Sequence, residues 1–254
     1  MPNARPRETA IYAVITGDIV GSTNLTTEQL ASLRKTLHET VRNFNRNEDR
    51  VLKGPEFFRG DSWQVLLNKP GFALNLTLLI QANLIEKLNV QTRAAIGIGP
   101  ITSMDKTLAT SVGEAFTLSG HALENITGNV RLSGALPGSA GPLRRWFPAI
   151  LHICGGLASS WTRRQAEAMG LWLSLVQPTH EAIAQRLKPS VTKQSVGDIL
   201  TSANWHYLYE AMNAFHMTDW QFLSQKNVET DEDAAHSASE QKKPTRRPSR
   251  KRKA

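Results

Sequence analysis

Apolar and polar residues alternate between strand-like and helix-like spacings in the first half of the chain. A short apolar run at residues 11–15 predicts a buried strand, which ends at Gly17-Asp18. Thr26 or Thr27 then caps a long predicted helix. The apolar positions of that helix recur every three or four residues, as one buried face requires: Leu30, Leu33, Leu37, Val41 and Phe44. The first two elements are therefore a strand and an amphipathic helix.

The following segments extend this pattern to six elements. Two short runs, residues 56–59 and 63–67, flank Gly60-Asp61 and predict a β-hairpin. A helix and then a strand follow, over residues 72–88 and 92–98. The order β-α-β-β-α-β is that of the ferredoxin-like arrangement. We therefore expect an α+β fold for this half of the chain.

Turn-forming residues separate this half from a helical one. The segment from Pro137 to Pro142 interrupts the pattern, and helical spacing dominates from Trp161 to Leu223. Beyond residue 227 the apolar spacing is lost, as in disordered segments. We predict three parts: a ferredoxin-like domain at 8–140, an all-α domain at 145–226 and a disordered basic tail at 227–254.

The helical part contains two short segments at the spacing of a helix-turn-helix. Thr179 caps a predicted helix at 180–187, a turn follows at 188–190, and a second helix covers 191–200. In such a module the first residues of the second helix contact base edges: Thr192, Lys193, Gln194 and Ser195. Double-stranded DNA is therefore an expected partner. The alternative is a helical scaffold that serves only protein contacts or dimerisation.

The amino-acid composition is typical of a soluble chain with one or two domains. Of the 254 residues, 40% are hydrophobic and 20% are charged. The single cysteine, Cys154, excludes an internal disulfide framework and a thiolate metal cluster. No apolar stretch approaches the ~20 residues that span a bilayer, and the N-terminus lacks the apolar segment of a secretory signal. We therefore expect a cytoplasmic protein without a membrane partner.

The net charge of +8 belongs to the end of the chain. Residues 241–254 contain eight Lys or Arg residues and no acidic residue, so residues 1–240 sum to zero. Such a tail suits electrostatic contact with nucleic acid, because each cation on a phosphate releases counterions. It equally suits a solubilising tail or a nuclear localisation signal.

Two aspartates occupy comparable positions in the predicted sheet. Asp18 ends the first strand and Asp61 lies in the hairpin turn. Because the first and third strands of a β-α-β-β-α-β sheet are central neighbours, we expect the carboxylates to converge. Such a pair suits Mg²⁺ or Mn²⁺ bound together with substrate phosphates, and the loop residues Gly21, Ser22 and Thr23 would favour an anion. The pattern predicts a nucleoside triphosphate site, unless both aspartates only form turns.

Three segments carry a family resemblance. The sequence Thr16-Gly-Asp-Ile-Val-Gly-Ser-Thr23 resembles the first metal-binding motif of the class III nucleotidyl cyclases. Arg59-Gly-Asp-Ser-Trp-Gln64 is similar to their second motif. The segment from Arg93 to Pro100 is similar to the strand that follows this motif in the family. With the segment 111–116 and the helical part, the chain resembles SatD-like proteins, which join a cyclase-like domain to a helix-turn-helix.

The resemblance implies a homodimer with a site at the subunit interface. Asp18 and Asp61 would hold two metal ions while a 3′-hydroxyl attacks the α-phosphate and pyrophosphate leaves. Arg59 and Arg93 would supply positive charge near the phosphates, unless they are plain surface arginines. The resemblance thus implies that the metal-binding residues of the site are present.

The substrate-orienting positions depart from the family. Phe57 stands where the family has its purine-selecting lysine, and we expect Phe57 among the nucleotide-binding residues. Lys53 lies four residues further back. Thr117 and His121 replace the asparagine and arginine of a later helix. We therefore predict a nucleotide-responsive DNA-binding regulator. The alternatives are an active nucleotidyl cyclase whose helical part dimerises, and a scaffold that binds neither ligand.

Overall fold

The computed structural model describes residues 10–46, 48–174 and 178–224. The predicted tail at 227–254 and the first residues of the chain lie outside these ranges, as do residues 175–177. None of the described helices combines the length and the apolar character that crossing a membrane requires.

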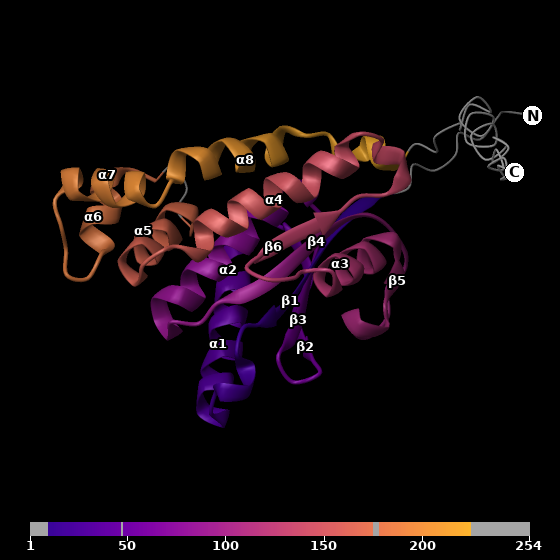
Figure 1. The fold of residues 1–254 in the computed structure, drawn as a ribbon, viewed down its shortest axis with the longest axis horizontal. Coiled ribbons are helices and arrows are strands. Elements are labelled where there is room, and N and C mark those ends of the chain that lie inside the picture. The colour runs from indigo at the N-terminus through magenta and orange to yellow at the C-terminus, as the bar shows by residue number, and fades with distance from the viewer. Residues whose placement is uncertain (1–9, 47, 175–177, 225–254) are drawn as a thin grey trace, which may run out of the picture.

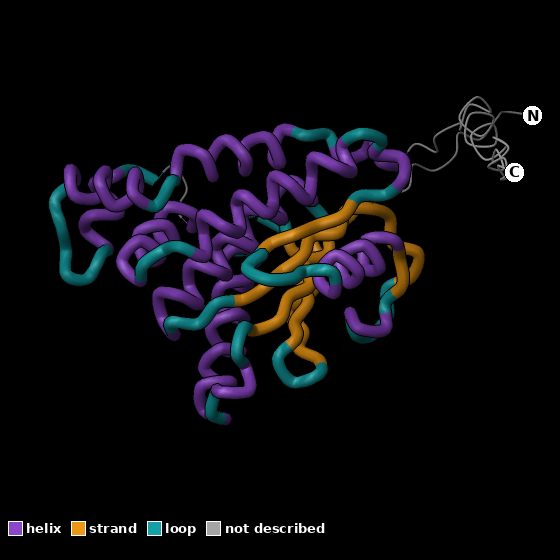
Figure 2. The backbone as a smooth tube through the Cα atoms, viewed as in Figure 1, coloured by secondary structure: helices purple, strands orange, loops and turns teal. Residues whose placement is uncertain are grey.

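The strands form a mixed sheet with a largely antiparallel centre (Figure 2). The strands are β1 (Ile11–Ile19), β2 (Val51–Phe58), β3 (Ser62–Leu67), β4 (Thr92–Ser103), β5 (Val112–Gly113) and β6 (Leu132–Ala135). Their order is β2-β3-β1-β4, and the far edge of β4 pairs with β5 and, in parallel, with β6. The predicted α+β class and the central pairing of β1 with β3 are therefore confirmed.

Helices cover both faces of this sheet (Figure 1). The helices α1 (Thr27–Phe44) and α2 (Ala73–Leu88) pack on one face, where Ile11, Ile15 and Trp63 enter the main core. The helix α3 (Glu114–Glu124) packs on the other face against Val14 and Leu66. Alternate β1 side chains therefore enter two different cores, as the strand period requires.

A helix that the sequence pattern did not predict follows the sheet. This helix, α4 (Leu143–Ser159), lies against β6 and α2. Pro148 and the pair Gly155-Gly156 are helix breakers that mask its signal in the sequence. Gly155 is nevertheless required, because a Cβ there would lie 2.6 Å from the Leu132 side chain. Close packing against β6 therefore outweighs the low helix propensity.

The remaining helices are α5 (Arg163–Ser174), α6 (His180–Arg186), α7 (Lys193–Ser202) and α8 (Trp205–Met217). Their buried residues belong to the same hydrophobic cluster as those of α1 and α2. The connection from α6 to α7 covers residues 187–192, longer than the predicted turn at 188–190. Pro189 disfavours helical geometry at Lys188, and Thr192 then caps α7. The boundary between the two predicted domains stays a prediction.

Candidate functional site

The end of β1 and the β2–β3 turn meet at one end of the sheet. Asp18 follows Thr16 on the α3 face of β1, and Asp61 ends the three-residue turn at 59–61. Arg59 and Gly60 adopt left-handed backbone angles in this turn, with φ of 49° and 91°. The Asp61 Oδ2 atom accepts a hydrogen bond from the Ser22 hydroxyl at 2.5 Å. The loop after Asp18 is therefore joined directly to the second predicted carboxylate.

Asp18 is held by Arg93, its partner in the antiparallel register of β1 and β4. The guanidinium donates from Nε to Oδ1 at 2.9 Å and from Nη2 to Oδ2 at 2.5 Å. The Asp18 side chain is 18% exposed and that of Arg93 is 40% exposed. This bond raises the pKa of Arg93, and the negative charge of Asp61 adds a smaller increase. Both carboxylates therefore act on one guanidinium.

A cation that arrives together with phosphates could use this set of oxygen atoms. No group of three or more His, Cys, Asp or Glu side chains gathers around a possible ion in the described ranges. Mg²⁺ needs fewer protein ligands, since it is commonly held by one or two carboxylates plus substrate phosphates and waters. Such an ion would take its oxygens from Asp18 and Asp61, in competition with Arg93.

The strand below Asp18 is tightly packed. A Cβ on Gly17 would lie 2.4 Å from Cζ2 of Trp63, whose side chain is fully buried. The Trp63 indole donates to the Thr92 hydroxyl at 3.2 Å, and this hydroxyl donates to the backbone carbonyl of Asp18. The buried Trp63 ring and the hydrogen bonds through Thr92 therefore fix the position of the Asp18 backbone.

The loop residues Gly21, Ser22 and Thr23 lie beside the two carboxylates, but they do not begin α1. Gly21 has a φ of 69° and precedes a short 3₁₀ turn at Ser22–Asn24. Thr26 then caps α1, and its side chain accepts from the amide of Gln29 in a capping box. The first turn of α1 is thus satisfied by its own cap. An anion at this site would contact the loop amides instead.

The two other predicted nucleotide contacts, Phe57 and Arg59, lie on the β2–β3 hairpin. The ring of Phe57 packs against α1, with its centroid 5.6 Å from that of His38 and 5.4 Å from Cζ of Arg34. Phe57 therefore lies on the sheet face opposite Asp18. Arg59 is exposed at the tip of the hairpin. The structure brings together Asp18, Asp61 and Ser22, and it does not bring Phe57 to them.

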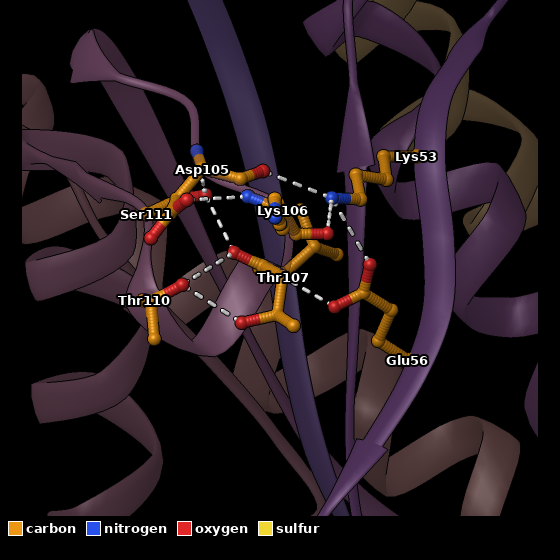
Figure 3. Close-up of polar contacts among 8 residues, drawn as sticks. Lys53, Glu56, Asp105, Lys106, Thr107, Thr110 and Ser111 are labelled. Carbon is orange, nitrogen blue, oxygen red and sulfur yellow. Dashed lines mark hydrogen bonds and ion pairs between the residues drawn. The ribbon is translucent and has the colours of Figure 1, made fainter.

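Lys53 is engaged in a separate polar cluster (Figure 3). Its ammonium donates to the backbone carbonyl of Asp105 at 3.0 Å and to that of Lys106, and it forms a 3.3 Å ion pair with Glu56. Glu56 in turn accepts from the amide of Leu108 at 2.6 Å. Lys53 therefore holds the 104–111 loop against β2.

The α3 positions that replace the family's asparagine and arginine make no polar contact with the carboxylates. Thr117 donates to the backbone carbonyl of Gly113 at 3.4 Å within its own helix, and His121 is exposed. The buried polar residues near this face are different ones. Thr16 bonds to Ser119 at 2.8 Å and accepts from Gln64 at 3.0 Å. Sequence spacing gave no signal for this network, because strand register alone brings Thr16 and Gln64 together.

The four predicted DNA contacts lie at the start of α7. Thr192 caps the helix by accepting from the amide of Ser195 at 3.1 Å, and the two hydroxyls bond to each other at 2.9 Å. Lys193 and Gln194 are exposed. Asp198, one turn later, is exposed as well. Lys193 and Gln194 are therefore the side chains of this set best placed for contacts outside the molecule.

Comparisons with known proteins give a structural likeness and no family match. No protein-family model matches the chain, and the search of curated proteins gave no match. Among solved structures, the chain is similar to the guanylyl cyclase Cya2, with 16% sequence identity and a TM-score of 0.32. That match covers 47% of this chain and 72% of the cyclase chain. A likeness of this size does not establish a family, and the SatD-like resemblance stays a hypothesis.

Proposed function

We propose that the chain binds a nucleoside triphosphate with Mg²⁺ or Mn²⁺ at Asp18 and Asp61, and that this binding regulates DNA contact by α7. The observation that carries the proposal is geometric: Arg93 donates two hydrogen bonds to Asp18, and Ser22, in the loop that follows Asp18, donates to Asp61. Two carboxylates at one end of the sheet, one of them already paired with a cation, form a site where a divalent ion can replace that cation.

Arg93 would have a second role in the loaded site. A guanidinium forms strong bidentate hydrogen bonds with phosphate oxygens as well as with carboxylates. When a metal ion takes the carboxylate oxygens, Arg93 is left beside the site as a phosphate donor. The 40% exposure of its side chain leaves room for such a change. Ser22 and the loop amides would contact the same phosphates.

Binding is better supported than turnover. The family places a lysine, an asparagine and an arginine where this chain has Phe57, Thr117 and His121. Phe57 packs on the other face of the sheet, and Thr117 bonds within its helix. Loss of one charge-stabilising donor typically lowers a rate ~10²–10³-fold. An active nucleotidyl cyclase is the second candidate, because the carboxylate pair remains.

Calorimetry with Mn²⁺ and each of the four nucleoside triphosphates tests the binding proposal. The variants Asp18→Asn and Asp61→Asn should each weaken binding at least tenfold, because a neutral amide is a poor metal ligand. Asp49→Asn is the matched control, since Asp49 is an exposed aspartate outside the site. Equal heats in all four proteins would refute the proposal. Chromatography of the same mixtures decides the enzyme question, because only a cyclase leaves a cyclic product.

The DNA part is tested separately on the full chain. We expect Lys193→Ala with Gln194→Ala to lose preference for a selected duplex over a scrambled one, as measured by fluorescence anisotropy. Each good base contact is worth ~1–3 kcal/mol of discrimination. Lys35→Ala serves as control, because Lys35 is exposed on α1. An unchanged preference in the double variant would remove α7 from the DNA interface.

A further inference from the structure

The helix α4 carries apolar side chains on two of its sides. Its buried side contains Phe147, Leu151, Cys154 and Ala158, which enter the main core. A second row leaves the core: Trp146 is 66% exposed, Ile150 37% and Ile153 64%, and Leu157 is partly buried. Single exposed apolar residues are ordinary, but a contiguous row marks an interaction surface.

A second helix beside α4 also carries exposed apolar residues. Helix α8 runs beside α4 in the opposite direction (Figure 1), and the rings of Phe147 and Phe215 stack at 5.3 Å between them. On α8, Tyr207 is 70% exposed, and Ala211 follows on the same side one turn later. The exposed apolar residues of these two neighbouring helices are called here the α4–α8 surface.

We propose that the α4–α8 surface is the interface with a second copy of this chain, with the two α4 helices antiparallel about a twofold axis. The row Trp146, Ile150, Ile153, Leu157 has spacings of four, three and four, which read the same in both directions. In an antiparallel pair, Trp146 therefore meets Leu157 of the second copy, and Ile150 meets Ile153. A symmetric interface requires a surface that is complementary to itself in this way.

Charge favours the same arrangement. Arg144 and Arg145 begin α4, and the helix contains no acidic residue. Parallel copies would place these arginines together, at a cost in repulsion. In the antiparallel pair Arg144 lies opposite Ser159 of the second copy, so the two arginine pairs are about 22 Å apart along the axis. This separation exceeds the Debye length of about 8 Å at physiological salt.

The exposed apolar side chains supply about half of the area that a standard dimer interface buries. The exposed parts of Trp146, Tyr207, Ile150 and Ile153 amount to roughly 400 Å² per copy, from the size of aromatic and aliphatic side chains. A standard interface buries about 800 Å² per partner. Small neighbours such as Ala149 and Gly156, both exposed on α4, allow close approach of the backbones that adds to this area. The inference does not depend on the nucleotide proposal.

Analytical ultracentrifugation of the full chain tests the proposal. We expect a dimer for the wild type and for Val112→Asp, and a shift to the monomer for Ile153→Asp, with at least a tenfold rise in the dissociation constant. Val112 is the matched control, since it is an aliphatic residue with 59% exposure on β5. Circular dichroism checks that the variants are folded. A monomeric wild type, or a dimer that Ile153→Asp leaves intact, would overturn the proposal.

Cysteine cross-linking tests the register even if Ile153→Asp does not fold. Oxidation of a mixture of Ile150→Cys and Ile153→Cys chains should give more disulfide dimer than either variant alone. The natural Cys154 is 3% exposed, so it does not compete. Cross-linking no greater than that of Val112→Cys would overturn the antiparallel pairing. An apolar and basic face could instead bind a membrane surface, and sedimentation with anionic vesicles tests this alternative. A monomer that binds vesicles through Trp146 also overturns the proposal.

Discussion

The contact between α3 and the sheet depends on the absence of one side chain. Gly97 lies on β4 directly below α3, and a Cβ there would be 2.3 Å from the carbonyl oxygen of Ala115 and 2.5 Å from the amide nitrogen of Ser119. Both are backbone atoms, so no side chain can rotate away. In Gly97→Ala the whole helix must lift from the sheet, which strains the second core and the bond from Ser119 to Thr16.

The cost can be estimated from these contacts. Overpacking of a close-packed core costs about 1–3 kcal/mol, and a weakened buried hydrogen bond adds about 1 kcal/mol. A chain of this size loses roughly 2–4 °C in Tm for each kcal/mol. We therefore expect Gly97→Ala to lower the Tm by roughly 5–15 °C in differential scanning calorimetry, relative to the wild type.

The matched variant is Gly99→Ala, two residues along the same strand and on the same face. A Cβ at Gly99 would meet the Ala115 nitrogen at 3.5 Å and the Glu114 Cβ at 3.6 Å, which are ordinary contacts. Both variants remove the same chain flexibility, so their difference isolates the clash with α3. We expect Gly99→Ala to keep or slightly raise the Tm. Equal Tm values for the two variants would refute the close approach of α3 to Gly97.

Three further outcomes follow from other sites. Gly17→Ala should destabilise the fold and shift the Trp63 fluorescence, because a Cβ there lies 2.4 Å from the indole; an unchanged spectrum would contradict this packing. Thr192→Ala should cost about 1 kcal/mol in chemical denaturation, since the cap of α7 is lost. Burial raises the pKa of the Cys154 thiol from 9.0 to about 11. The unfolded thiol therefore ionises first, and the free energy of unfolding should fall as pH rises from 9.0 to about 11, with a smaller fall in Cys154→Ala.

The cause of each missed feature is specific. The sequence pattern omitted α4 because Pro148 and its glycines lower helix propensity, whereas burial against β6 restores the helix. The sequence pattern also predicted Phe57 as a nucleotide-binding residue, because of its spacing from Asp61. The face on which a strand residue lies depends on register, and here the register pairs Phe57 with the core residue Trp63.

Local sequence was sufficient for the strands and helices of the α+β part, for the turn that holds Asp61 and for the cap of α1. These features depend on hydrophobic period and on neighbouring residues, both of which are written in the chain order. Only the tertiary structure decided that Arg93 holds Asp18, that α3 rests on Gly97 and that α4 shows an apolar row to the outside. Each of these joins residues that are distant in sequence, so it is determined by strand register and close packing, which no local pattern contains.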